Sequence, residues 1–358
     1  MSNGKYKALW LEDRSLVVID QTKLPFAYET KRLNTSEDAV NAISNMTVRG
    51  AGVIGNVGAF GVYLAAVESD GDLAKIEKLA AQIRVARPTA VNLVWAVDRM
   101  LRVIRNSQDV IDRARQEAID ITDEDVVNSQ KIGEFGCEII EKLAQAKHGE
   151  TVNILTHCNA GWLAIADRGT ALAPIYEAFD RGINIHVWVD ETRPRNQGAN
   201  LTTWELKQQG IPHTLIADNT GGLLMQYGMV DMCIVGADRV TRCGDVVNKI
   251  GTYLKALAAT ANHLPFYVAL PASTLDMQMR DAVKEVEIET RSEDEVLYMH
   301  GIDDVGAINR IRIAPHQTKA ANYAFDITPA HLVTGLITER GICTPSEATI
   351  TQMFDDLI

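Results

Sequence analysis

Short apolar runs alternate with helix-like segments in the second part of this chain, from residue 151 onward. Such alternation predicts a parallel sheet whose strands are joined by right-handed crossover helices. Three of the runs end in reactive or charged residues, among which Cys158 and Asp238 stand out. Because ligands bind outside the carboxyl ends of the strands in open α/β sheets, we expect these side chains to converge on one small-molecule site. The three runs cover residues 153–156, 185–189 and 232–235.

The first part of the chain has a different pattern, which predicts a mostly helical domain with a small β entry. We therefore expect an α/β protein in which this N-terminal domain, residues 1–148, precedes a Rossmann-like catalytic domain at residues 149–358. The N-terminal pattern predicts a hairpin at 7–11 and 15–19 and helices near 36–46, 53–67, 73–86, 90–106 and 107–146. The C-terminal pattern predicts strands near 152–156, 184–189, 214–216, 232–236 and 266–270, and helices near 162–180, 200–210 and 247–262.

The overall composition excludes several classes of function. A formal net charge of −12 argues against a nucleic-acid or membrane-surface partner, because such binding requires a basic surface. No apolar run reaches the roughly 18 residues that cross a membrane, and the first seven residues lack the apolar core of a signal peptide. We therefore expect a cytoplasmic protein. The five cysteines form no CxxC pair, which favours free thiols over a zinc site, and no glycine-rich dinucleotide or P-loop motif for a cofactor is present.

Cys158 is the first candidate for catalysis. It follows a predicted strand and precedes a small Asn-Ala-Gly turn and a predicted helix, whose N-terminal N–H groups would favour the thiolate. Such a thiol can act as a nucleophile, as an acid or base, or as a polar group that steers a transition state; the alternative is a buried cysteine that packs as a small hydrophobe. Cys137, Cys233 and Cys343 lie within regular patterns and are predicted to be structural, whereas Cys243 stays open.

Asp238 is the second candidate, because a partly buried carboxylate at a strand end can act as a general acid or base. Gly236 and Ala237 leave room beside it. The alternative is an ion pair with Arg239 or a helix cap. Asp190 and Glu191 follow a neighbouring strand and are rival carboxylates.

Several cations and amides are candidates for anion binding. Arg49 lies in a glycine-rich turn before a helix, where backbone N–H groups and a guanidinium can share one phosphate. Arg87 precedes a predicted helix, and Asn248 and Lys249 lie at another predicted helix start. Gln197, in a long polar loop, offers an amide to sugar hydroxyls or phosphate. Each of these cations alone is more often a solvated surface residue, and the alternative for Gln197 is a plain surface loop.

The motifs together resemble the methylthioribose-1-phosphate isomerase family, within the superfamily that contains the regulatory subunits of initiation factor 2B. The resemblance extends over nearly the whole chain and is specific as a set rather than in any one motif. The matching stretches are VRGAGVIG (48–55), ARPTAVNLVWAVDRM (86–100), ILTHCNAGWLA (154–164), VDETRPRNQGANLT (189–202), VGADRV (235–240), GDVVNKIGTY (244–253) and AFDITPAHLVTGLITERGI (324–342).

This resemblance implies an aldose–ketose isomerase that needs neither a cofactor nor a metal and acts on a 5-substituted ribose 1-phosphate. It implies that Cys158 and Asp238 are the catalytic pair and that the protein is a homodimer. Asp238 would protonate the ring oxygen, and hydrogen would then move from C2 to C1 through an enediol or as a hydride. The substrate-binding residues that it implies are Arg49, Gly50, Ala51, Arg87, Gln197, Asn248 and Lys249.

Other functions remain open from the sequence. A 5-deoxyribose 1-phosphate isomerase or a ribose 1,5-bisphosphate isomerase would share these motifs and differ in how the group at C5 is bound. A non-enzymatic regulatory subunit of the initiation-factor type would share the fold without needing Cys158 and Asp238. A cysteine hydrolase would need His157 or His186 beside the thiol. Residues 295–316 are longer than the family pattern and resemble an insertion.

Overall fold

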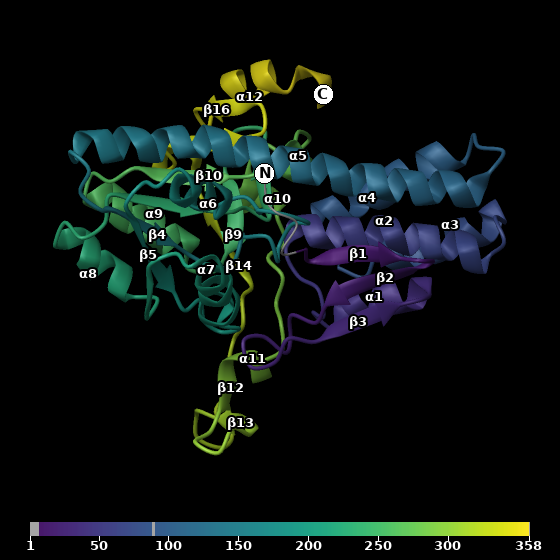
Figure 1. Ribbon diagram of the computed structural model, residues 1–358, viewed down its shortest axis with the longest axis horizontal. Helices are drawn as coiled ribbons and strands as arrows, with labels where there is room; N and C mark the ends of the chain where they lie inside the picture. Colours follow the sequence, from purple (N-terminus) through teal and green to yellow (C-terminus); the bar gives the residue numbers. More distant parts are fainter. Residues whose placement is uncertain (1–6, 88–89, 358) are drawn as a thin grey trace.

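The computed structural model describes residues 7–87 and 90–357 and shows a helical part beside a part built on a parallel sheet (Figure 1). The predicted hairpin is confirmed, and a third antiparallel strand extends it into a small sheet. This third strand has no apolar alternation of its own, which is why its sequence did not suggest a strand. The strands are β1 (Leu9–Glu12), β2 (Ser15–Ile19) and β3 (Thr30–Leu33).

Four helices follow the small sheet and confirm the predicted helical pattern. The first is capped by Thr35, whose side chain accepts from the N–H of Asp38. The central helix consists almost wholly of buried residues, and its small side chains let the neighbouring helices approach closely. The helices are α1 (Ser36–Ser44), α2 (Ala51–Glu68), α3 (Leu73–Arg84) and α4 (Val91–Ile104).

Helix α2 contradicts the expectation that no apolar run is long enough to cross a membrane. Its 18 residues pass that test by length and hydropathy, but 83% of them are buried inside the fold. Buried Val53, Val57 and Phe60 pack within the core of the helical part. The length and apolarity of α2 therefore fit a core helix.

The long helix α5 (Val110–Ala146) connects the two parts of the molecule. It runs along the whole length of the ribbon, over both the helices and the sheet (Figure 1). Its first half contributes Ala114 and Ile121 to the core of the helical part, and its second half contributes Ile132 and Ile140 to the core beneath the sheet. Because one helix serves both cores, the division into domains near residue 148 stays a prediction.

A seven-stranded sheet confirms the predicted α/β class. Its strand order is β16-β15-β10-β7-β4-β5-β6, and all neighbouring strands are parallel except β16. The five predicted strands are present as β4 (Val152–Thr156), β5 (Ile185–Asp190), β6 (His213–Ile216), β7 (Met232–Val235) and β10 (Phe266–Ala269), and β15 (Gly335–Thr338) and β16 (Gly341–Cys343) complete the sheet. The helices of this part are α6 (Ala173–Asp180), α7 (Thr203–Gln209), α8 (Thr220–Gln226), α9 (Thr252–Ala261) and α12 (Glu347–Met353), and a π-helical turn at Gly198–Thr202 precedes α7.

A second sheet corrects one prediction. The helix predicted at 247–262 begins only at Thr252, and the residues before it form strand β9 (Val246–Lys249). The buried pair Val246-Val247 suits a strand, and β9 pairs with the distant β14 (Phe325–Thr328). Asn248 and Lys249 therefore end a strand rather than begin a helix. The sheet has the order β11-β8-β9-β14, with β8 at Arg239–Thr241 and β11 at Leu275–Asp276.

The predicted insertion forms a separate hairpin. Among the residues that the structure describes, strands β12 (Tyr298–Ile302) and β13 (Ile308–Arg312) pair only with each other, and the short helices α10 (Ala282–Glu285) and α11 (Asp294–Leu297) precede them. The hairpin projects from the body of the molecule (Figure 1). Its tip is exposed, with Val305 at 88% exposure.

Candidate functional site

The candidate site lies where the order of the main sheet reverses. Chain order runs outward from β4 to β5 and β6 on one side and from β7 to β10 on the other, so the switch point lies between β4 and β7. Cys158 follows β4 and Asp238 follows β7. Open α/β sheets bind their ligands at such switch points.

Both side chains line one small cavity of about 40 Å³, here called the inner cavity. Arg49 reaches it from the turn before α2, so the helical part closes the site on the sheet. Six of the nine predicted site residues line this cavity: Arg49, Gly50, Ala51, Cys158, Asp238 and Asn248.

Cys158 has a constrained backbone. Its φ of +67° lies in the left-handed region, which non-glycine residues seldom occupy. Two threonines hold this conformation: Thr192 Oγ1 accepts from the N–H of Cys158 at 2.8 Å, and Thr202 Oγ1 donates to its carbonyl oxygen at 2.7 Å. The predicted helix N-terminus beside the thiol is wrong, because α6 begins only at Ala173 and the preceding loop is irregular.

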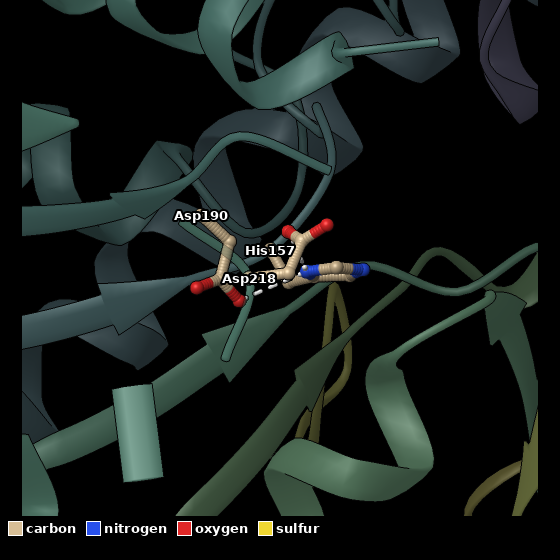
Figure 2. A group of neighbouring side chains, drawn as sticks. All are labelled: His157, Asp190 and Asp218. Carbon is tan, nitrogen blue, oxygen red and sulfur yellow. Dashed lines mark hydrogen bonds and ion pairs between the residues drawn. The ribbon is translucent and has the colours of Figure 1, made fainter. Parts of the chain in front are cut away.

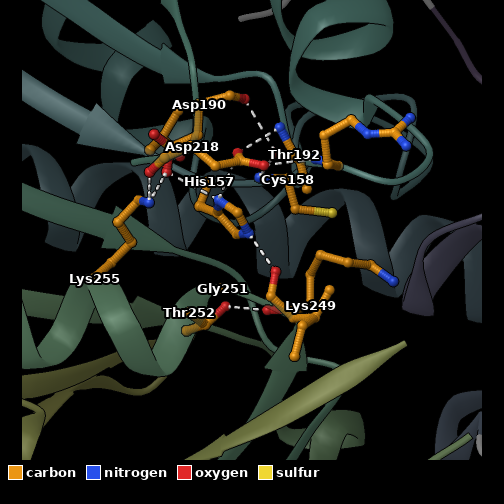
Figure 3. Close-up of polar contacts among 12 residues, drawn as sticks. His157, Cys158, Asp190, Thr192, Asp218, Lys249, Gly251, Thr252 and Lys255 are labelled. Atoms are coloured by element: carbon orange, nitrogen blue, oxygen red, sulfur yellow. Dashed lines mark hydrogen bonds and ion pairs between the residues drawn. The ribbon is translucent and has the colours of Figure 1, made fainter. Parts of the chain in front are cut away.

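Behind the thiol lies a buried polar network (Figure 3). His157 Nδ1 lies 2.9 Å from Asp190 Oδ2, and His157 Nε2 lies 2.8 Å from the carbonyl oxygen of Ile250. That carbonyl only accepts, so Nε2 carries a hydrogen. Lys255 Nζ lies 3.1 Å from the same Asp190 oxygen. One carboxylate oxygen of Asp190, a rival catalytic carboxylate in the sequence, therefore contacts both His157 and Lys255.

His157, Asp190 and Asp218 also form a group of metal-ligand types, whose donor atoms lie within 4.8 Å of one another (Figure 2). Lys255 already brings a positive charge to this group. Asp218 in turn accepts from the backbone N–H groups of Thr192 and of the residue after it. We therefore interpret the group as a structural ion cluster that supports the loop beside Cys158.

The histidines needed by a cysteine hydrolase do not pair with the thiol. Both ring nitrogens of His157 are bonded to Asp190 and to the backbone of Ile250. His186 lies on β5, where its Nε2 is 2.9 Å from Thr214 Oγ1. The structure thus offers neither histidine as a base for Cys158.

Lys249 and Arg87 do not line the inner cavity, but both are buried, and the charge of Asp238, which lines the cavity, affects their pKa values. Burial, together with the nearby charge of Arg291, lowers the pKa of Lys249 to about 8, whereas Cys158 and Asp238 oppose the shift. Burial and Arg291 likewise lower the pKa of Arg87, against the opposing effect of nearby carboxylates. These cations are positioned to strengthen the positive potential at the cavity.

Arg291 is a cation that sequence reasoning missed. Its Nε lies 2.6 Å from Glu289, which also lies 3.6 Å from Arg87, and its guanidinium stacks over Phe325. Lys249 Nζ lies over the same ring at 4.7 Å. No local motif marked Arg291, because it comes from an irregular segment more than 40 residues from Lys249 in sequence.

Gln197 lies on a second, larger cavity of about 460 Å³, here called the outer cavity. Arg49 lines both cavities, so the two lie on either side of its side chain. The side chain of Gln197 is buried, and its Oε1 has no hydrogen-bond partner among the described residues. An unpaired buried amide oxygen favours a polar ligand at this position. The outer cavity is also lined by residues 21–26 and by the projecting hairpin.

The other cysteines lie away from the two cavities. Burial raises the pKa of Cys137 to about 12 and that of Cys343 to about 11, and it also raises the pKa of Cys233. Burial and the nearby Glu347 raise the pKa of Cys243. All five cysteines are free thiols. The predicted structural role of Cys137, Cys233 and Cys343 fits these surroundings, because such groups resist ionisation.

Fold and site together define an α/β protein with a ligand site at the switch point of a parallel sheet, closed by a helical part that supplies a guanidinium. The sequence pattern of the initiation factor 2 subunit family matches residues 47–345. A methylthioribose-1-phosphate isomerase from Sulfurimonas denitrificans is 59% identical over 98% of this chain and 99% of its own. One from Desulfatibacillum aliphaticivorans is 53% identical over 99% of this chain and 98% of its own.

Two solved structures resemble this chain over nearly its whole length. The 5-methylthioribose 1-phosphate isomerase of Pyrococcus horikoshii OT3 is 36% identical, with a TM-score of 0.84 over 99% of this chain and 97% of that chain. A chain from A. fulgidus described as the delta subunit of translation initiation factor eIF-2B is 38% identical, with a TM-score of 0.82 over 98% of this chain and 100% of that chain. The chain belongs to the initiation factor 2 subunit family and, within it, to the methylthioribose-1-phosphate isomerases.

Proposed function

We propose that this protein converts 5-methylthioribose 1-phosphate to the corresponding ribulose 1-phosphate. The observation that supports this most is that Cys158, Asp238 and Arg49 line one cavity at the switch point of the sheet. The curated relatives with 51–59% identity are isomerases of this substrate.

The proposed chemistry follows from the groups at the inner cavity. The phosphate on the anomeric oxygen prevents simple ring opening, so an acid must protonate the ring oxygen. Asp238 supplies that proton, and hydrogen then moves from C2 to C1. Cys158 acts as the base or stabilises the transition state. Arg49, with the buried charges of Arg87 and Lys249, binds the phosphate and fixes its position, which lowers the entropic cost of reaction.

The outer cavity suits an uncharged substituent at C5. At about 460 Å³ it is within the usual size of a ligand pocket, roughly 300–1,000 Å³. Two of its arginines are already paired, Arg195 with Glu295 at 2.7 Å and Arg310 with Asp294 at 2.6 Å. A second phosphate on the substrate would have to compete with those carboxylates for the two arginines. The apolar side chains that line this cavity are Leu24, Phe26, Met46, Pro194, Leu201, Met299 and Ile308.

A panel of substrates that differ only at C5 tests the proposal. Purified protein is mixed with 5-methylthioribose, 5-deoxyribose and 5-phosphoribose 1-phosphates, and ketose formation is followed by NMR. We expect the methylthio compound to have the highest kcat/KM and the bisphosphate the lowest. Preference for the bisphosphate would contradict the proposed substrate.

A regulatory subunit is the second candidate, because the structural relative from A. fulgidus carries an initiation-factor name. Such a protein would bind a sugar phosphate without converting it. If none of the three compounds is turned over while one of them still raises the melting temperature, the regulatory function replaces the enzymatic one.

We also propose a cytoplasmic homodimer. Five free thiols suit a reducing compartment. Helices α8 and α9 lie side by side on one flank (Figure 1) and expose large apolar side chains that a second copy would cover. The most exposed of these are Tyr227 at 71% and Leu254 at 60%. Light scattering should give twice the mass of 39.3 kDa, and Leu254→Glu should shift the protein toward the monomer.

A further inference from the structure

The guanidinium of Arg49 is held by a residue of the opposite part of the molecule. Arg49 Nη1 donates to Asn159 Oδ1 at 2.5 Å, and Nη2 donates to the backbone oxygen of Asn159 at 2.9 Å. This contact works only if the amide of Asn159 presents its oxygen toward Arg49, because its NH₂ group would face another donor. The orientation of one amide therefore decides where the guanidinium points.

That orientation is set in part by Thr202, whose Oγ1 accepts from Asn159 Nδ2 at 3.2 Å, and at shorter distance by Glu205, on α7. Its carboxylate accepts from Asn159 Nδ2 at 2.8 Å, so the NH₂ group must point away from Arg49. The same carboxylate accepts from the N–H groups of Trp162 and Leu163 and from the hydroxyl of Tyr176. Four donors thus converge on one acceptor, and a group that only accepts is required there.

The carboxylate of Glu205 is costly to bury, which calls for a reason beyond packing. Its side chain has no exposed surface, and burial raises its pKa to about 7 although all four hydrogen bonds oppose the shift. Glu205 lines neither the inner nor the outer cavity. It reaches the site only through Asn159 and through the loop that follows Cys158.

We propose that Glu205 is a positioning residue for phosphate binding: through Asn159 it fixes the guanidinium of Arg49 at the inner cavity. The inference rests on the proposed function, in which Arg49 binds the substrate phosphate. It also explains why a loop of the sheet domain and a turn of the helical part are fixed to each other at the site.

The test is a set of double-mutant cycles. Asn159→Ala and Glu205→Gln are made in the wild type and in Arg49→Ala, and kcat and KM are measured with 5-methylthioribose 1-phosphate. In the wild type each change should raise KM about tenfold, with kcat within about threefold. In the Arg49→Ala background neither should change KM by more than about twofold, because the residue on which they act is gone.

Glu117→Gln is the matched control, since Glu117 is another buried carboxylate but lies in the helical part, paired with Arg99 and Arg113. It should leave KM unchanged. Equal increases in KM with and without Arg49 would mean that Asn159 and Glu205 only stabilise the fold, and the proposal would be overturned. If Glu205→Gln does not fold, the Asn159→Ala cycle alone tests the proposal, because Glu205 acts on Arg49 through Asn159. An Asn159→Ala effect on KM that does not depend on Arg49 would then overturn it.

A binding measurement separates this proposal from the proposed function. Inorganic phosphate should raise the melting temperature of the wild type, less so that of Asn159→Ala and Glu205→Gln, and not that of Arg49→Ala. A wild type that responds to phosphate but converts none of the sugar phosphates would refute the isomerase function and leave the Glu205 proposal standing. A full phosphate response in both single variants would refute the Glu205 proposal itself.

Discussion

Two side chains at neighbouring strand ends, Cys158 and Asp238, supply the proposed chemistry. Cys158→Ser and Asp238→Asn each keep the shape of the side chain and remove its reactive character. We expect each to lose at least roughly two orders of magnitude in kcat, the usual scale of acid–base catalysis. Steady-state kinetics on folded protein measure this. Near-normal turnover in either variant would remove that residue from the mechanism.

Lys249 links phosphate binding to pH. Its pKa of about 8 means that the free protein loses this positive charge as pH rises through 8. Bound phosphate favours the charged form, so affinity should fall on the alkaline side and kcat/KM should decrease above about pH 8. In Lys249→Arg the guanidinium stays charged, and this decrease should disappear from the pH profile. The same alkaline decrease in both proteins would assign it to another group.

The sequence predicts which side chains lie together where a position is tied to a strand end, while the roles of these side chains stay predictions. Cys158 and Asp238 follow predicted strands, and because ligands bind outside the carboxyl ends of strands in open sheets, the sequence predicts that these two residues lie close together. The roles of Thr192, Thr202 and Glu205 were missed, because each acts through a hydrogen bond to a backbone group or amide more than 30 residues away. No local pattern reports such a partner.

The turn before α2 needs Gly50. Its φ is +101°, and a Cβ there would lie 2.6 Å from the Cα of Ala164. Gly50→Ala should therefore destabilise the protein by about 1–3 kcal/mol and raise KM, because Arg49 is displaced with it. Thermal melts and kinetics test both effects. Gly182→Ala is the control, with a φ of +75° but nothing within 4 Å of the added carbon; an equal effect there would refute the steric argument.

Helices α2 and α5 meet at a buried carboxyl. Burial raises the pKa of Asp125 to about 7, against a hydrogen bond from Asn56. The folded protein then binds more protons than the unfolded chain between about pH 4 and 7, so this group makes folding less favourable as pH rises through that range. Asp125→Asn should raise the free energy of unfolding by about 1–4 kcal/mol at pH 8 and by little at pH 4.

Urea denaturation at the two pH values measures this difference. Asp123→Asn, on the exposed face of α5, serves as the control and should have no effect at either pH. An Asp125→Asn protein with the same stability as the wild type at pH 8 would show that the buried carboxyl imposes no cost.

At the scale of elements, the periodicity of apolar residues predicts whether a segment is a helix or a strand better than it predicts where that segment begins and ends. Local pattern alone predicts the long helix α5 and five strands of the main sheet, but it missed β15 and β16. The local pattern predicts a helix start at strand β9, because its partner β14 is about 80 residues away in sequence. Residues 162–172 are predicted to be helical but form a loop, in which Glu205 on α7 accepts from the N–H groups of Trp162 and Leu163.

At the scale of the whole molecule, the proposed substrate site is assembled from three separate regions: the sheet, the helical part and the projecting hairpin. The hairpin pairs only with itself, yet Tyr298, Met299 and His300 line the outer cavity. The hairpin therefore forms one wall of the proposed C5 pocket and contributes little to the main cores.

Replacement of residues 299–311 by a short Gly-Ser linker should therefore alter specificity rather than stability. Loss of the apolar wall should raise KM for 5-methylthioribose 1-phosphate about tenfold, since burial of a methylthio group is worth about 1–2 kcal/mol. KM for 5-deoxyribose 1-phosphate, which has less to bury, should change less, and the melting temperature should stay the same. Val305→Ser, at the exposed tip, is the control and should affect neither substrate. An equal increase in KM for both substrates would mean that the hairpin does not contact the C5 group.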